Sequence, residues 1–169
     1  MSKDIFANYP HELPASSAPN SPVYTLLPGY YACHGWHASA LATKPIQTFD
    51  EDDIALLAGE PEPADAAASP TKLSPVYALV PGGGAGSMAV PTGRVFIRFA
   101  DGVKAGDHET EIGKAGYKVE QTLDYAPNAA WLRARSSNIA DALNGIDALQ
   151  QIAGVENVEP QMLMHASYR

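Results

Sequence analysis

The pattern of apolar and polar residues is clearest after about residue 92. Arg94–Phe99 is an apolar run that ends at the turn signal Asp101-Gly102, and Tyr117–Leu123 alternates between apolar and polar positions. A further apolar run, Ala129–Ala134, follows the turn residues around Pro127, and another, Val155–Glu159, ends before Pro160. Four β-strands are therefore expected, at Arg94–Phe99, Tyr117–Leu123, Ala129–Ala134 and Val155–Glu159.

Two segments between these strands have helical features. Ile139–Ile152 places apolar residues at helical spacing and follows Ser137 or Asn138 as the N-cap. Gly106–Ala115 is shorter and is weakened by Gly113. The order strand, helix, strand, strand, helix, strand predicts an α+β fold, namely a ferredoxin-like βαββαβ antiparallel sheet with two helices on one face. The other face would be free for a partner.

The first half of the chain has a different composition. Residues 1–91 hold most of the proline-punctuated, Ala-rich and Gly-rich stretches, such as Gly59–Pro70. Such segments bury too little side chain to offset the entropy of ordering the backbone. We therefore expect a long, mostly irregular N-terminal extension at 1–91 and a folded domain at 92–169. Within the extension, the acidic run Asp50–Asp53 is expected to cap a short helix at Ile54–Leu57.

A nine-residue motif occurs twice in this extension. Ser21–Gly29 returns as Ser74–Gly82 with seven of nine positions identical, so both copies read SPVYxLxPG. Proline before and Pro-Gly after the apolar centre are typical of a short strand that ends in a turn. The sequence leaves two interpretations open. The copies are either a pair of edge strands or two docking motifs that add a strand to a partner's sheet, with Tyr24 and Tyr77 as the contacting side chains.

Charge and composition exclude several classes of function. The chain carries a net charge of -8, and its first 90 residues hold 3 Lys/Arg against 9 Asp/Glu. No basic stripe could neutralise phosphates, so neither nucleic acid nor an anionic membrane is expected as a partner. No apolar run reaches the length of a membrane span, and the N-terminus lacks the apolar core of a secretion signal. A cytoplasmic location is therefore expected.

One segment has metal-binding residue types. Cys33, His34 and His37 lie close together in the sequence, and a thiolate with two imidazoles can ligate Zn²⁺ or Cu²⁺. A structural zinc site needs four ligands, and the chain has no second cysteine. The favoured interpretation is a packed aromatic loop, with metal binding as the alternative. No Gly-x-Ser-x-Gly elbow is present, and nothing in the sequence orients a base beside Cys33. We expect no catalytic site and no cofactor.

The last seventy-odd residues resemble the propeptides, or inhibitor domains, of subtilisin-like serine proteases. Four segments carry the resemblance, in the family's order and spacing, and the closing one is the most specific: Val95–Val103, Ala115–Val119, Tyr125–Leu132 and Ile152–Pro160. The resemblance spans roughly residues 93–169 and does not cover the extension. The first helix is shorter and more interrupted by glycine than is usual in the family.

The resemblance implies an inhibitor and intramolecular folding chaperone, as in a protease zymogen, acting in cis or in trans. The sheet would dock on the protease, where Glu159 could cap a helix N-terminus or remain a solvated side chain. The C-terminal tail would lie in the substrate cleft like a product strand, through Met162, Leu163, Met164, His165, Ala166, Ser167, Tyr168 and Arg169. A second hypothesis is an adaptor or assembly protein, in which the ferredoxin-like unit is a scaffold and the repeats recruit partners.

Overall fold

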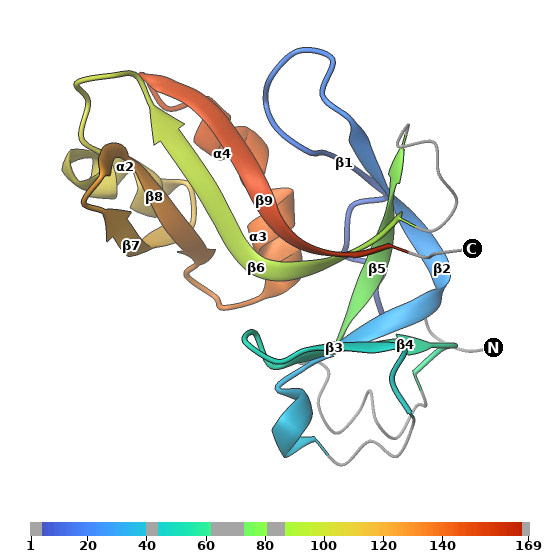
Figure 1. The fold of residues 1–169 in the computed structure, drawn as a ribbon. Coiled ribbons are helices and arrows are strands. Elements are labelled where there is room, and N and C mark those ends of the chain that lie inside the picture. Colours follow the sequence, from blue (N-terminus) through green and yellow to red (C-terminus); the bar gives the residue numbers. More distant parts are fainter. Residues whose placement is uncertain (1–4, 40–43, 62–72, 81–86, 167–169) are drawn as a thin grey trace. The chain divides into compact units, whose positions relative to one another are not determined.

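A computed structural model describes residues 5–39, 44–61, 73–80 and 87–166 of the chain (Figure 1). The strands within these residues are β1 Glu12–Pro14, β2 Val23–His34, β3 Gln47–Phe49, β4 Ile54–Ala58, β5 Leu73–Val80, β6 Ser87–Phe99, β7 Tyr117–Leu123, β8 Ala126–Ala134 and β9 Val155–Ala166. The helices are short: the 3-10 turns η1 Trp36–Ala38 and η3 Ala105–His108, and the α-helices α2 Glu109–Lys114, α3 Ile139–Asn144 and α4 Ile146–Gln150.

Hydrogen bonds join the strands in the order β3-β4-β2-β5-β6-β8-β7. In addition, β1 pairs with β2 and β9 pairs with β6. The pairings β2–β4, β3–β4, β5–β6, β6–β8 and β7–β8 are all antiparallel. The chain divides into two compact units. Unit 1 contains residues 1–12, 24–92 and 162–169, and unit 2 contains residues 13–23 and 93–161.

Unit 1 has buried side chains on both faces of its central strands. Successive residues of a strand point to opposite faces, so adjacent side chains of β2 and β4 enter different clusters. One cluster consists of Tyr31, Cys33, Ala55, Leu57 and Leu73, with Phe6 and Trp36 packed against it. The other consists of Ala32, Ile54, Leu56, Val76, Met88 and Val90, with Leu27, Tyr30, Phe49 and Leu163 packed against it. We call the second group the Val76 cluster.

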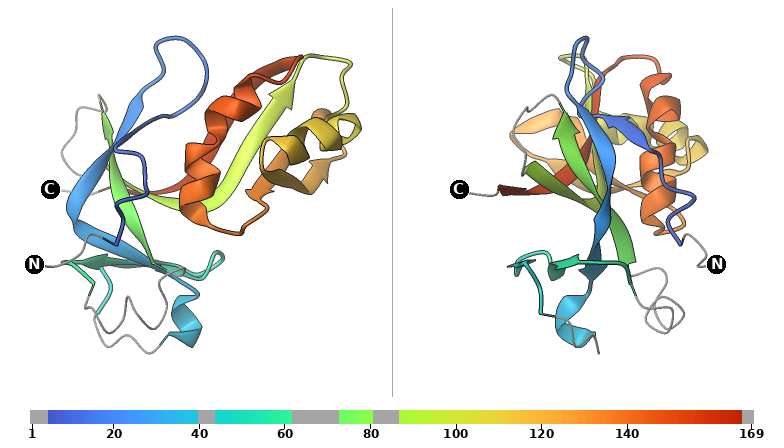
Figure 2. Two further views of the ribbon diagram at one scale, coloured as in Figure 1. Left: turned by 180° about the vertical axis from the view of Figure 1, so that it is seen from behind. Right: turned by 90° about the vertical axis from the view of Figure 1, so that its right-hand side faces the viewer.

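Unit 2 places its helices on one face of its strands. In Figure 1 the strands β6 and β9 lie in front of α3 and α4, and in the view from behind the helices lie in front (Figures 1 and 2). Apolar side chains from the strands and helices are fully buried or nearly so, among them Val95, Ile97, Phe99, Ile112, Leu143 and Leu149. The side chain of Asn138 accepts a hydrogen bond from the Asp141 amide at 3.1 Å, so the predicted cap of the longer helix is confirmed.

The predicted fold class is wrong. The described chain is mostly β, with nine strands joined in one hydrogen-bonded network and only short helices, and it is not a ferredoxin-like fold. The physical reason lies at the ends of two strands. β6 begins at Ser87 and pairs with β5 through Tyr77↔Ala89, while β9 runs on through Pro160 to Ala166. The sheet therefore does not stop at the four strands that the sequence pattern indicates.

The expectation of a mostly irregular extension is also wrong. Residues 5–39, 44–61 and 73–80 contain five of the nine strands, and paired strands satisfy one another's backbone hydrogen bonds. Averaging composition over ninety residues hid short apolar runs such as Ile54–Leu57. That run is strand β4 and not a helix, because its side chains are buried alternately in both clusters of unit 1. The stretch 62–70, which dominates the composition, lies outside the described residues.

The expected helix Ile139–Ile152 is divided at Gly145 into α3 and α4. Tyr117 of β7 fills the space beside this glycine: a Cβ at position 145 would lie 2.7 Å from the Tyr117 hydroxyl oxygen. The same hydroxyl donates a hydrogen bond to the Ala142 carbonyl. The break follows from glycine's low helix propensity together with the packing of this ring.

Candidate protein-binding site

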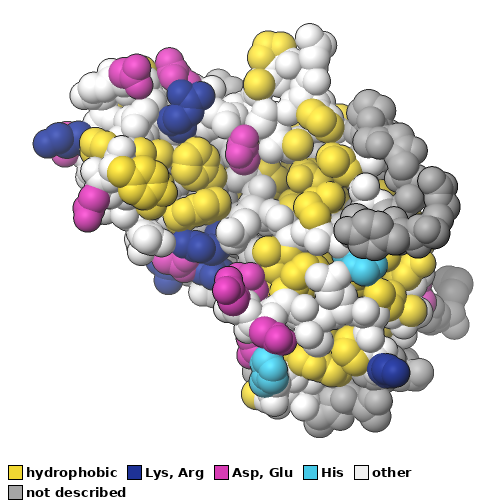
Figure 3. Space-filling model, in the orientation of Figure 1, with side chains coloured by type: hydrophobic (Ala, Val, Ile, Leu, Met, Phe, Trp, Pro, Cys, Tyr) yellow, Lys and Arg dark blue, Asp and Glu magenta, His cyan; other side chains and the backbone are white. Residues whose placement is uncertain are grey.

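Unit 2 leaves one face of its strands without helices, and β6 shows how its side chains divide. Val95, Ile97 and Phe99 are buried, whereas the intervening Arg94, Phe96 and Arg98 are partly or well exposed. We define the open face as Arg94, Phe96, Arg98, Glu120, Trp131, Arg133 and Glu156. Figure 3 shows hydrophobic side chains gathered in this part of the molecule, with acidic and basic side chains beside them.

The centre of the open face is aromatic. Phe96 and Trp131 lie directly opposite each other on β6 and β8, with ring centroids 5.1 Å apart and planes at 63°. The guanidinium carbon of Arg94 lies 4.8 Å from the centroid of the Trp131 ring, a cation–π distance. Both rings are only partly buried. Partly exposed aromatic and arginine side chains are the residue types enriched at protein interfaces.

Charges around the aromatic pair are matched within unit 2. Glu120 contacts the Arg94 guanidinium at 2.7 Å and also the Arg133 guanidinium. Arg98 and Glu156 form a second ion pair at 2.9 Å, with about half of each side chain exposed. Because these charges already have counter-charges, a partner could cover the face without supplying a strongly charged surface of its own.

Glu159 lies in a hydrogen-bonded network of unit 2. Its carboxylate accepts a hydrogen bond from the Asn157 side-chain amide at 3.0 Å. The Asn157 side-chain oxygen accepts from the Ser17 hydroxyl at 3.0 Å, and that hydroxyl also accepts from the Val158 amide at 3.0 Å. This network fixes the direction of Glu159, whose side chain is partly exposed.

Of the expected tail residues, Met162 to Ala166 form the end of β9 and belong to unit 1. Leu163 packs against the Val76 cluster, and a ring nitrogen of His165 hydrogen-bonds the Gln47 side chain of β3. Met162 is partly buried, whereas Met164 is 42% exposed. Ser167, Tyr168, Arg169 and the side chain of Ala166 lie outside what the structure describes.

Both repeat tyrosines are buried in unit 1. Tyr77 has no exposed surface and donates its hydroxyl proton to the Pro10 carbonyl at 2.8 Å, and Tyr24 is 9% exposed. Burial raises the pKa of the Tyr77 phenol above its ordinary value. The two repeats contribute to the neighbouring strands β2 and β5. Of the two interpretations that the sequence leaves open, this arrangement favours a pair of structural strands.

The proposed metal ligands point to different neighbours. Cys33 is buried in a cluster of unit 1, His34 lies 2.8 Å from the Ser74 hydroxyl, and His37 Nδ1 lies 2.5 Å from the Asp53 carboxylate. A hydrogen bond from the His37 backbone amide is the main cause that lowers the pKa of Asp53. Within the described ranges, no three His, Cys, Asp or Glu side chains are grouped closely enough to hold a metal ion.

The contact between His34 and Ser74 is not evident from the sequence, since forty residues separate them. A histidine nitrogen beside a serine hydroxyl is the pair that activates a nucleophile in serine hydrolases. Here the Ser74 side chain has no exposed surface and lies among core residues of β5. A substrate could not reach this hydroxyl as it is placed, so the contact satisfies a buried polar group.

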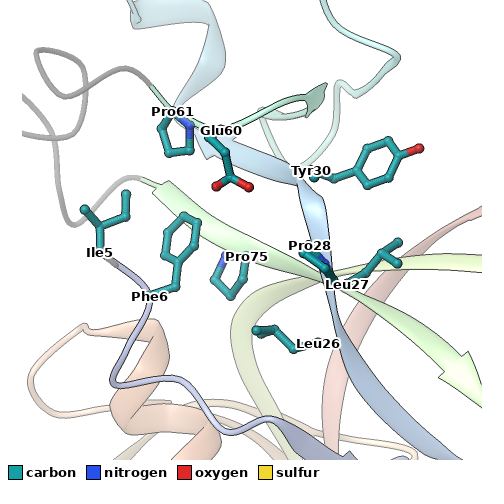
Figure 4. Close-up of a pocket in the computed structure, with 10 residues that line it drawn as sticks. Ile5, Phe6, Leu26, Leu27, Pro28, Tyr30, Glu60, Pro61 and Pro75 are labelled. Atoms are coloured by element: carbon teal, nitrogen blue, oxygen red, sulfur yellow. The ribbon is translucent and has the colours of Figure 1, made fainter. Parts of the chain in front are cut away.

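Unit 1 also contains a cavity of about 450 Å³ beside the repeats (Figure 4). Its lining is rich in apolar and proline residues and also contains Tyr30 and Glu60: Ile5, Phe6, Leu26, Leu27, Pro28, Gly29, Tyr30, Glu60, Pro61 and Pro75. Pro28 and Gly29 come from the first repeat and Pro75 from the second. Apolar side chains make up most of the lining, and Glu60 and Tyr30 are the lining residues with polar side-chain groups.

Comparison with protein-family models, with curated proteins and with solved structures finds no match for this chain. In the described part of the chain, no helix combines the length and apolar character that crossing a membrane requires.

Proposed function

We propose that this chain is an inhibitor and folding assistant of a subtilisin-like serine protease. The observation that carries the proposal is the open face of unit 2, where Phe96 and Trp131 form an apolar centre among paired charges. Residues 93–169 resemble the propeptides of subtilisin-like serine proteases, and this resemblance suggests a protease of that class as the partner. The open face supplies a surface of the kind that such a partner would cover.

Docking on this face gains free energy mainly by burying the two rings. Replacing a central aromatic or arginine residue of an interface by alanine typically costs about 2 kcal/mol or more of binding free energy. The ion pairs at the margin contribute less because solvent screens them. The proposed interface therefore has its strongest contacts at Phe96 and Trp131, with Arg94 held over the indole ring.

The tail supplies the inhibitory contact. Residues Met162–Arg169 would enter the substrate cleft as an extended product-like strand, bound through backbone hydrogen bonds and alternating side chains. The part up to Ala166 is already a β-strand, so the backbone needs little change of conformation. Attachment to a docked unit 2 makes cleft binding intramolecular, which raises the tail's effective concentration to the millimolar range or so.

Glu159 is suited to a further contact with the protease. Its hydrogen bond to Asn157 orients the carboxylate, and an oriented carboxylate is attracted to the positive end of a helix. The Glu159 side chain is partly exposed, so a donor on the partner could reach it. We propose that Glu159 meets a helix N-terminus of the protease.

The adaptor function is not favoured by the repeats, because the two tyrosines that would recruit partners are buried. Exposing Tyr77 would also break its hydrogen bond to the Pro10 carbonyl. We therefore do not propose it as a second function.

A paired assay tests the proposed function. The full chain is added in trans to the catalytic domain of several subtilisin-like proteases and, as a control, to a chymotrypsin-like serine protease. We expect competitive inhibition of at least one subtilisin-like enzyme and a higher yield of active enzyme when that protease is refolded from denaturant with the chain present. Equal behaviour with the control protease, or no effect on either readout, would contradict the proposal.

A further inference from the structure

The end of β9 is occupied by contacts within unit 1. Leu163 packs against the Val76 cluster, whose members are nearly or fully buried, and a ring nitrogen of His165 hydrogen-bonds the Gln47 side chain. Met164, between them, is 42% exposed. This alternation is that of a strand with one face packed on a core and the other in solvent.

The same residues are those that the proposed function assigns to the protease cleft. The Leu163 side chain cannot pack against the Val76 cluster and line an enzyme's subsite at the same time, and the strand's backbone cannot bind two sites at once. Binding in unit 1 and binding in the cleft are therefore mutually exclusive for residues 162–165. The energy of the internal contacts must be overcome before the tail can act on the protease.

We propose that unit 1 is a regulatory element that sequesters residues 162–165 of the inhibitory tail and thereby weakens inhibition by the isolated chain. This inference depends on the proposed function and names how the same site is regulated. The apparent affinity of a tail that is free only part of the time falls in proportion to the fraction that is free. Any change that loosens the strand in unit 1 should then tighten inhibition.

Gln47 offers a way to loosen the strand without altering the tail. It lies on the short strand β3 and its side chain is the hydrogen-bond partner of His165. Thr48 is the adjacent residue, points away and is exposed, so Thr48→Ala is a matched control on the same strand. Neither substitution changes a residue that the protease would contact.

Two readouts on the full chain test the inference. Amide hydrogen exchange of residues 162–165 is measured in the free protein, and the inhibition constant is measured against the protease that the wild type inhibits. For Gln47→Ala we expect faster exchange of these amides and an inhibition constant lower by about three- to tenfold, since losing one hydrogen bond costs about 0.5–1.5 kcal/mol. Thr48→Ala should leave both readouts unchanged.

The outcomes separate the two proposals. Unprotected amides at 162–165 in the wild type, or faster exchange in Gln47→Ala with unchanged or weaker inhibition, would overturn the regulation while leaving inhibition itself intact. Failure of the wild type and of both variants to inhibit any subtilisin-like protease would overturn the proposed function, and the regulation with it. Protected amides together with tighter inhibition by Gln47→Ala alone would support the regulation.

Discussion

Phe96 and Trp131 face each other across the β6–β8 pairing, with their ring centroids 5.1 Å apart in an edge-to-face arrangement. Their neighbours on either side along the strands are buried, yet these two rings remain partly exposed. Arg94 lies over the indole ring and is itself paired with Glu120. The open face thus has an ordered apolar centre before any partner binds, which reduces the entropy lost on docking.

Truncating the aromatic centre should weaken protease binding far more than it weakens the fold. For Trp131→Ala we expect the inhibition constant to rise by about 30-fold, equivalent to about 2 kcal/mol. The melting temperature should fall only modestly because the ring is partly exposed already. Inhibition kinetics and thermal unfolding measure the two effects.

Thr110→Ala is the control for this substitution, because Thr110 is exposed on α2, which belongs to the helical face of unit 2. It should leave the inhibition constant unchanged. An equal effect of the two substitutions would mean that the open face is not the docking surface.

Glu120 neutralises two arginines, so its replacement should destabilise unit 2. Glu120→Gln leaves Arg94 and Arg133 close together without a counter-charge, and we expect a loss of about 0.5–1 kcal/mol in the free energy of unfolding. The loss should shrink in 1 M salt, which screens the repulsion. Urea unfolding at low and high salt measures it. Glu109→Gln on α2 removes the same charge, and an identical loss there would refute the specific role of Glu120.

Two buried phenols predict a loss of stability in alkali. Burial is the main cause that raises the pKa of both Tyr77 and Tyr117. Because the pKa of each tyrosine is raised in the folded state, its contribution to the free energy of unfolding is fully present below the ordinary tyrosine pKa of about 10. This contribution is lost as the pH rises through the folded-state pKa. The unfolding free energy should therefore fall above pH 10.

Tyr117→Phe separates this effect from other titrations. At neutral pH the variant should lose about 1–2 kcal/mol, because the Ala142 carbonyl loses its donor. Since the variant has no phenol to ionise at this position, its stability should fall less steeply in alkali, and the gap to the wild type should narrow between pH 9 and pH 11. A constant gap over that range would contradict the assignment.

Gly145 should be intolerant of any side chain. The Cβ of Gly145→Ala would lie 2.7 Å from the Tyr117 hydroxyl oxygen and 3.0 Å from a ring carbon, so the ring must shift. We expect a loss of about 1–3 kcal/mol in chemical denaturation. For Gly106→Ala, where no atom lies within 4 Å of the added Cβ, the change should stay within about 0.5 kcal/mol. Similar costs at both positions would show that packing against Tyr117 is unimportant.

Local patterns predicted where strands occur but not how far they extend. The four expected strand segments all lie within strands of the structure, from β6 to β9. The continuation of β6 back to Ser87 and of β9 on to Ala166 depends on partners in unit 1, many residues away. Pairing with a strand far away in the sequence leaves no pattern of apolar and polar residues near the strand itself. This is why the predicted fold class was wrong.

Only part of the candidate site could be predicted from the sequence. Phe96 occupies the same strand face as Arg94 and Arg98, which the alternation of β6 indicates. Its contact with Trp131 depends on the β6–β8 register, and that register requires the structure. The contacts of Leu163 and His165 in unit 1 were likewise hidden, because the Val76 cluster and Gln47 come from a region whose composition suggested an irregular chain.

The most direct test of the proposed function is the inhibition constant of the full chain, and of a chain shortened to end at His165, against a subtilisin-like protease. We expect competitive inhibition by the full chain and an inhibition constant at least about tenfold higher after removal of residues 166–169, since fewer residues fill the cleft. No inhibition by the full chain would contradict the proposed function. Equal inhibition by the two chains would contradict the product-like binding of the tail.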